Sequence, residues 1–219
     1  MITLLCLRKA GEPPPAGVEL PGGGPVRLIE EGPIGAWVMD GRPGEGLSAV
    51  RAHDAVVRAA LRTGTPLPAR FGTVFPDQDT LLSTLRERLD ALADALNRVE
   101  GAVEMGVRVG WDEREPARVQ PEARQGGRAF LEARRREFEE RERLRERADA
   151  LLDAVEAVVP RPLAAIRRVL PEPGVAGTLA HLVHKESVRS FRIAIEEARA
   201  SFPRADLRLS GPWAPYSFV

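Results

Sequence analysis

The order of apolar and polar positions over the first 64 residues predicts three strands followed by a helix. A continuous apolar run at 2–7 is typical of a buried strand. Two shorter runs, at 26–31 and 34–40, are separated by a Gly-Pro pair, which indicates a hairpin. Apolar and small residues then recur at helical spacing over 47–64, and this helix ends at a glycine. We therefore expect a small β-β-β-α unit at the N-terminus.

The clearest periodic pattern in the chain lies between residues 77 and 101. Its apolar residues are three or four positions apart, as on one side of a helix: Leu81, Leu85, Leu89, Leu92, Leu96 and Val99. The preceding segment, 66–75, has prolines at its start and is expected to be extended. In the following segment, 102–110, apolar and polar residues alternate, as in a strand with one exposed face. Residues 66–110 are therefore predicted to form a β-α-β unit.

A highly charged stretch follows at 128–149, where 15 of 22 residues carry a charge of either sign. Glutamates precede arginines by four positions, which favours a helix with a solvated surface. Only a thin apolar seam remains along it: Leu131, Phe138 and Leu144. Two further helices are predicted at 150–159 and 163–170, each ending at a proline. Together these segments are interpreted as a helical insert at about 121–170.

Beyond the insert, the pattern predicts a strand, a helix and a strand, at 174–183, 185–202 and 205–211. Residues 66–219 are thus read as β-α-β, a helical insert and β-α-β, which is a modified ferredoxin-like order. The predicted fold class is α+β with two domains. We expect an N-terminal domain at 1–64 and a ferredoxin-like domain at 66–219, which ends in an aromatic tail at 211–219.

Charge and composition narrow the class of protein. The 219 residues include 32 basic and 32 acidic side chains, so no overall positive field draws the chain to nucleic acid or an anionic membrane. The strand at 102–110 also lacks the aromatic residues that stack on RNA bases. The first residues resemble neither a signal peptide nor a membrane span. We expect a cytoplasmic protein with no nucleic-acid or membrane partner.

The reactive residue types form no recognisable catalytic or metal-binding set. The glycine-rich loops lack the Lys-Ser/Thr pair of a phosphate-binding loop. Cys6 is the only cysteine and lies in an apolar run, so we expect a buried, unreactive thiol. His181 and His184 form an H-x-x-H pattern without a third ligand nearby, and a structural role is expected for both.

The remaining candidates also have structural interpretations. His53 lies on a predicted helix, where a structural role is expected. Asp77 and Asp79 resemble a D-x-D metal motif, but they stand where a helix begins, so capping is the favoured interpretation. We therefore predict no enzyme activity, no catalytic residue, no cofactor and no metal site.

The aromatic tail is the most unusual feature of the sequence. The chain has 11 aromatic residues, and Trp213, Tyr216 and Phe218 fall within its last seven positions. Prolines stiffen this segment, and aromatic side chains are common anchors. The tail either packs onto the protein itself as a structural clasp or contacts a partner. We favour a clasp that lies near the RFGTVF segment and helps to fix the two domains, since an exposed aromatic tail promotes aggregation.

Arg70 and Phe71, at the start of RFGTVF, are candidates for the same clasp or partner contact. We expect Arg70 to be buried at a strand edge, where an arginine is paired within the protein.

Three stretches resemble the gas vesicle protein F/L family. They are residues 67–109, with the motif RFGTVFPD; 126–137, GGRAFLEARRRE; and 180–219, which ends in GPWAPYSFV. The resemblance implies a non-catalytic protein of gas vesicle formation with a modified ferredoxin-like C-terminal domain. It also implies a minor shell component or assembly factor, located at the gas vesicle, that contacts the small hydrophobic major shell protein and other accessory proteins.

Two other functions remain as alternatives. A ferredoxin-like small-ligand sensor rests on analogy of fold alone. A protein-binding module unrelated to gas vesicles is the other. The resemblance favours the gas vesicle protein, because a shell subunit with a large apolar surface needs a partner that shields it before assembly.

Overall fold

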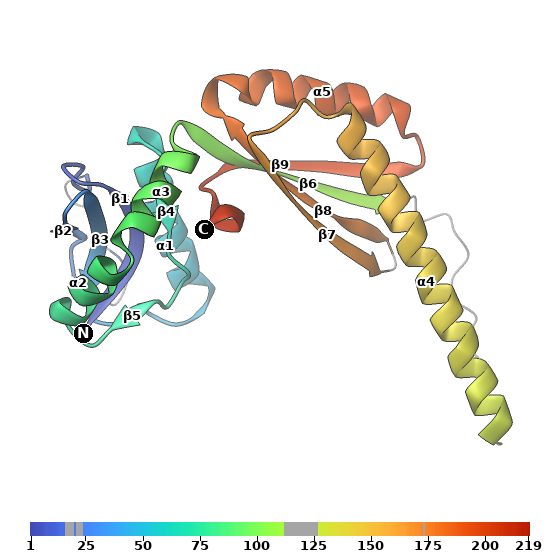
Figure 1. Cartoon of the computed structure of the whole chain (residues 1–219), viewed down its shortest axis with the longest axis horizontal. Coiled ribbons are helices and arrows are strands. Elements are labelled where there is room, and N and C mark those ends of the chain that lie inside the picture. The colour runs from blue at the N-terminus through green and yellow to red at the C-terminus, as the bar shows by residue number, and fades with distance from the viewer. Residues whose placement is uncertain (16–19, 21–23, 112–126, 173) are drawn as a thin grey trace. The chain divides into compact units, whose positions relative to one another are not determined.

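The computed structural model describes the whole chain except residues 16–19, 21–23, 112–126 and 173 (Figure 1). Its contacts divide the chain into two compact units. The first unit comprises Met1–Glu104, Leu182–Lys185 and Gly211–Val219. The second unit comprises Met105–His181 and Glu186–Ser210. The mixed composition of helices and strands confirms the predicted α+β class.

The sheet of the first unit is built on the predicted hairpin. Its described strands are β1 (Ile2–Lys9), β2 (Arg27–Glu31), β3 (Ile34–Asp40), β4 (Leu67–Pro68) and β5 (Val74–Phe75). The order is β2-β3-β1-β4, with β5 also paired to β1, and these neighbouring strands pair antiparallel. The register of β1 and β3 runs from Ile2 opposite Asp40 to Lys9 opposite Ile34, with a shift between Leu4 and Cys6.

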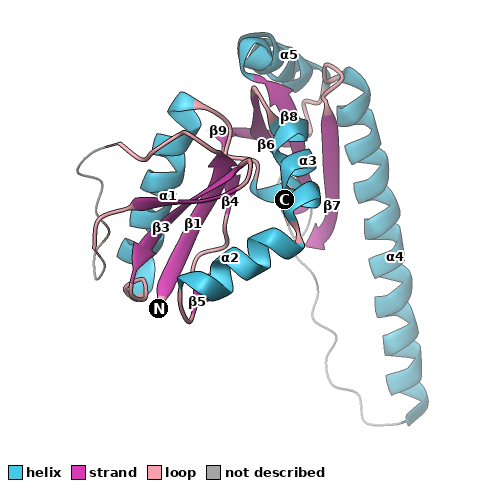
Figure 2. Cartoon of the chain, turned by 60° about the vertical axis from the view of Figure 1, so that its left-hand side comes forward, coloured by secondary structure: helices cyan, strands magenta, loops and turns pink. Residues whose placement is uncertain are grey.

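Helices cover both faces of this sheet (Figure 2). Helix α1 (Gly46–Thr63) packs through Val56, Val57 and Ala60 on the face that carries Leu5 and Trp37. Helices α2 (Gln78–Glu87) and α3 (Leu89–Val99) pack on the opposite face. Because β1 is covered on both sides, its apolar run is continuous rather than alternating.

The long periodic stripe at 77–101 is two helices in the structure. They are separated at Arg88, whose φ of −119° and ψ of 16° are not helical. The predicted cap is confirmed: the Asp77 carboxylate accepts a hydrogen bond from the Thr80 amide at 2.8 Å. The Thr80 hydroxyl donates a second hydrogen bond to the same carboxylate. The two hydrogen bonds lower the pKa of the Asp77 carboxyl, and the one from the backbone amide has the larger effect.

The second unit has the ferredoxin-like order β-α-β-β-α-β. Its elements are β6 (Ala102–Trp111), α4 (Gly127–Val158), β7 (Ala164–Glu172), β8 (Val175–His184), α5 (Val188–Ser201) and β9 (Ala205–Trp213). The sheet order is β7-β8-β6-β9. Three of these strands, β6, β8 and β9, have end residues that belong to the first unit. In Figure 1, α4 continues well beyond the strands of this sheet.

The interpretation of 121–170 as a wholly helical insert is wrong. The helices predicted at 128–149 and 150–159 are one helix, α4, and the segment predicted as a third helix at 163–170 lies largely in strand β7. Pairing with β8 overrides the helical spacing of this short segment. Helix α4 is therefore the first helix of the ferredoxin-like order, rather than an insertion between its second and third strands.

The division into units also differs from the predicted boundary between residues 64 and 66. The segment 66–75 supplies β4 and β5, which pair with β1. Helices α2 and α3 bury their leucines on the same sheet, so the chain through Glu104 belongs to the first unit. The first ferredoxin-like strand is consequently β6 rather than 66–75.

Among the described residues, no helix is both long enough and apolar enough to cross a membrane.

Candidate functional site

The C-terminal tail is bound by the first unit. After β9, Ala214 and Pro215 are buried, and a 3-10 turn follows at Tyr216–Phe218. The Glu104 carboxylate accepts two hydrogen bonds from Ser217, one from its amide and one from its hydroxyl, each at 2.8 Å. Both donors meet a charged acceptor, which makes these bonds stronger than neutral ones.

Apolar contacts hold the tail at two places. Ala214 belongs to the core cluster on the α1 face of the sheet. Phe218 packs against the cluster on the opposite face, which also includes Leu182 and the partly buried Phe75. Phe75 is the last residue of RFGTVF, so this segment and the tail share one apolar cluster, although no hydrogen bond joins them among the described contacts.

The aromatic side chains of the tail meet polar residues of α1. The Arg58 guanidinium lies 4.2 Å from the ring centroid of Trp213, within cation–π range. Arg58 also forms an ion pair with Asp54, one turn earlier, at 2.6 Å. Tyr216 remains 39% exposed. Burial raises the pKa of its phenol to about 12, and the nearby negative charge of Asp54 raises it further.

Phe71 reaches the same helix from the turn between β4 and β5. Its ring meets that of His53 edge-on, with centroids 5.8 Å apart and an interplanar angle of 87°. His53 is buried, and its Nε2 lies 3.1 Å from the carbonyl oxygen of Ala69. Burial lowers the pKa of His53, which favours the neutral ring. Consecutive residues of α1, His53 and Asp54, thus face the RFGTVF turn and the tail respectively.

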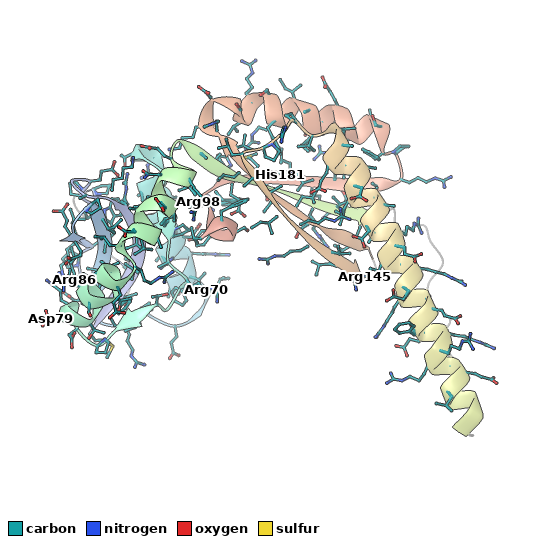
Figure 3. All side chains as sticks on the ribbon, in the orientation of Figure 1. Arg70, Asp79, Arg86, Arg98, Arg145 and His181 are labelled. Carbon is teal, nitrogen blue, oxygen red and sulfur yellow. The ribbon has the colours of Figure 1, made fainter. Side chains whose placement is uncertain are left out.

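The expectation of a buried Arg70 is wrong. Its side chain is exposed at the surface of the first unit (Figure 3). Its backbone carbonyl accepts hydrogen bonds from the amide and the hydroxyl of Thr73, at 3.1 and 2.8 Å. Residues 70–73 form a turn, and a side chain at a turn projects into solvent more readily than one within a sheet.

The sequence did not single out Glu104, Asp54 or Arg58, although these residues contact the tail. Glu104 is one of the polar residues on an alternating strand, and its position alone gives no indication of a partner 113 residues away. The pair Asp54 and Arg58 has the ordinary i, i+4 spacing of a surface helix.

Among the remaining ionisable candidates, Cys6 and His181 are buried. Burial raises the pKa of Cys6 to about 12, so its thiol stays protonated and unreactive near neutral pH. His181 is buried and His184 is exposed, because residues three apart on a strand point to opposite faces. In the described part of the chain, no three His, Cys, Asp or Glu side chains lie close enough together to hold a metal ion.

Fold and site together define a two-sheet α+β protein whose aromatic C-terminal segment is built into its first unit. The family model described as "Gas vesicle synthesis protein GvpL/GvpF" matches residues 5–219, and the chain belongs to this family. This result confirms the resemblance drawn from the sequence motifs, and it assigns the protein a role connected with gas vesicles.

Relatives in one bacterium carry both family names. Gas vesicle protein L of Streptomyces sp. (strain CB03234) is 34% identical, in an alignment that covers 92% of this chain and 79% of the relative. Gas vesicle protein F of the same strain is 32% identical, with 89% and 88% coverage.

A solved structure has the same fold. The crystal structure of GvpF from Anabaena sp. PCC7120 aligns with a TM-score of 0.74 at 16% identity, over 99% of this chain and 97% of that chain. The similarity extends over both units, so the two-sheet architecture is that of a known gas vesicle protein fold.

Proposed function

We propose that this protein is a non-catalytic accessory factor or minor shell component of gas vesicles, and that it binds the hydrophobic major shell subunit. The observation that carries the proposal is the family match over residues 5–219. Location at the gas vesicle follows from the same proposal.

The physical reason for such a partner lies in the shell subunit. A subunit that faces gas in the finished shell must present an apolar surface, and in water this surface drives aggregation before assembly. The second unit offers large apolar side chains to solvent: Leu131, Phe138, Leu163, Leu170 and Ile193, each at least 40% exposed. A partner that covers exposed apolar groups on both molecules gains free energy from their burial.

We assign the aromatic tail to structure rather than to partner binding. Trp213, Ser217 and Phe218 each contact a residue or cluster of the first unit. These contacts support a clasp within that unit, because a side chain engaged in its own protein is less available to a partner.

Co-expression with the major shell subunit tests the proposal. We expect a tagged full-length chain to retain the untagged subunit through affinity purification. A matched chain of an unrelated ferredoxin-like protein, with the same tag, controls for nonspecific adsorption of a hydrophobic subunit. Equal recovery with both chains, or no recovery with either, contradicts the proposed function.

A further inference from the structure

The two edges of the second sheet differ in how they are protected. Strand β9 forms one edge, and there the Nε of Arg199 donates a hydrogen bond to the carbonyl oxygen of Leu207 at 2.9 Å. Pro212 further along β9 has no backbone N–H to offer. Strand β7 forms the other edge, and none of the described hydrogen bonds from outside the sheet reaches its backbone over 164–170. An unprotected edge is a template for another strand.

Proline indicates which residues of β7 point their backbone groups outward. Pro171 lies within this edge strand, where a proline is tolerated because its N–H side faces away from the sheet. The carbonyl oxygen of Arg168, a residue of the other parity, lies close to Gly177 on β8. Backbone groups of alternate residues point to opposite edges of a strand, so Arg167 and Val169 direct their N–H and C=O groups outward. Pro171 has the same parity, and its missing N–H lies on the outward side, as is usual for proline in an edge strand.

Helix α4 holds β7 in place. The guanidinium of Arg167 donates hydrogen bonds to Asp149, at 2.6 Å to the carboxylate and 2.8 Å to the backbone carbonyl. It also pairs with Asp153 and, at 3.4 Å, with Glu156. Three acidic residues on successive turns of α4 therefore fix one side chain of the strand. An edge that is ordered in advance loses less entropy when a partner strand is added.

The side chains along β7 indicate the chemistry of a partner. Leu163, just before the strand, is 50% exposed, and Leu170 is 40% exposed. Arg168 is exposed and forms no ion pair among the described residues, unlike its neighbour Arg167. An aliphatic segment with a carboxylate opposite Arg168 complements this surface in both apolar character and charge.

A second copy of the chain is a poor partner for the outer edge of β7. Antiparallel self-pairing about Arg167 would place the two Arg167 side chains directly opposite each other. The two unpaired Arg168 side chains would then be diagonal neighbours, about 7–8 Å apart. The Arg167 side chains are neutralised by the acidic residues of α4, but the like charges of the two Arg168 side chains disfavour this pairing, so charge favours a different molecule over a copy.

We propose that the outer edge of β7 binds a partner protein by strand addition, and that the added strand is mainly aliphatic with an acidic residue facing Arg168. This inference rests on the proposed function, in which the partner is the major shell subunit; the added strand then belongs to that subunit. The outward N–H and C=O groups of Arg167 and Val169 provide the hydrogen bonds.

Two variants and a matched control test the edge in the full-length chain. Arg168→Glu reverses the exposed charge, and Val169→Pro removes an outward N–H. Arg189→Glu is the control, because Arg189 is an exposed residue of α5 outside the sheet. With the purified major shell subunit as the probe, we expect Arg168→Glu to weaken binding about tenfold, the effect of an interfacial charge pair. Val169→Pro should abolish binding, and Arg189→Glu should bind as the unaltered chain does.

Hydrogen exchange gives a second readout that does not depend on variants. We expect the amides of Arg167 and Val169 to become protected when the shell subunit binds. If the unaltered chain binds but Arg168→Glu binds equally well and these amides stay unprotected, strand addition at β7 is overturned while the proposed function stands. If the unaltered chain does not bind the subunit, both fail. Concentration-dependent dimers that Val169→Pro abolishes would overturn the inference in favour of self-pairing.

Discussion

Replacement of Glu104 by alanine tests whether the tail stabilises the first unit. The carboxylate accepts two hydrogen bonds from Ser217, each at 2.8 Å, and both donors lose their partner in Glu104→Ala. A hydrogen bond to a charged group contributes about 1.5–3 kcal/mol when buried. Because both residues are partly exposed, water replaces some of this, and we expect a total loss of about 2–3 kcal/mol.

The assay is thermal unfolding followed by circular dichroism or calorimetry. For a chain of this size, 1 kcal/mol corresponds to about 2–4 °C, so Glu104→Ala should lower the Tm by about 5–10 °C. Glu100→Ala is the matched control: Glu100 is an exposed acid that pairs with Lys9 at 2.7 Å, and surface pairs contribute about 0–1 kcal/mol.

A truncated chain separates the tail's contribution from other roles of Glu104. Deletion of residues 212–219 should itself lower the Tm. In that background Glu104→Ala should cost less than about 0.5 kcal/mol, because its two donors are already gone. An unchanged Tm for Glu104→Ala, or an equal loss with and without the tail, would refute the clasp.

Three further predictions concern the fold. Burial lowers the pKa of His181 from 6.5 to about 4, so as the pH falls the unfolded chain binds a proton before the folded chain does. The free energy of unfolding should therefore decline between about pH 6.5 and 4, by about 3 kcal/mol in all, and urea unfolding of His181→Phe should show a shallower decline. Gly177→Ala places a Cβ 2.7 Å from Leu152 and against the Arg168 carbonyl, and should cost about 1–3 kcal/mol in the same assay, whereas an unchanged midpoint would contradict the close approach. Asp77→Ala removes a helix cap and should lower the urea midpoint, whereas Asp77→Asn, which can still accept the hydrogen bond from the Thr80 amide, should retain most of the stability.

Local patterns predicted the elements of the first unit well. The hairpin around the Gly-Pro pair, helix α1 and the cap at Asp77 all depend on residues close together in the sequence. The α+β class was also predictable, because helical and strand periodicities both occur along the chain. The ferredoxin-like order was assigned to the wrong segments, since its first strand is β6 and its second strand, β7, lies where a helix was predicted.

Pairing between segments far apart in the sequence determined the elements that the local apolar patterns predicted wrongly or left open. The segment 163–170 has helical spacing, yet it forms most of β7, because β8 offers a glycine that accepts its close approach. The segment 66–75 is extended as expected, but nothing local indicates that its partner is β1 rather than a strand of the second sheet. The motif at the tail was visible in the sequence, whereas its acceptor Glu104 was an ordinary polar residue of a strand.

The most direct test of the proposed function is light scattering of the major shell subunit as it is diluted out of denaturant into buffer. With an equimolar amount of this protein present, we expect scattering to stay near the buffer level and the two chains to co-sediment as one soluble complex. If the subunit aggregates at the same rate with and without the protein, the proposed binding of the shell subunit is contradicted.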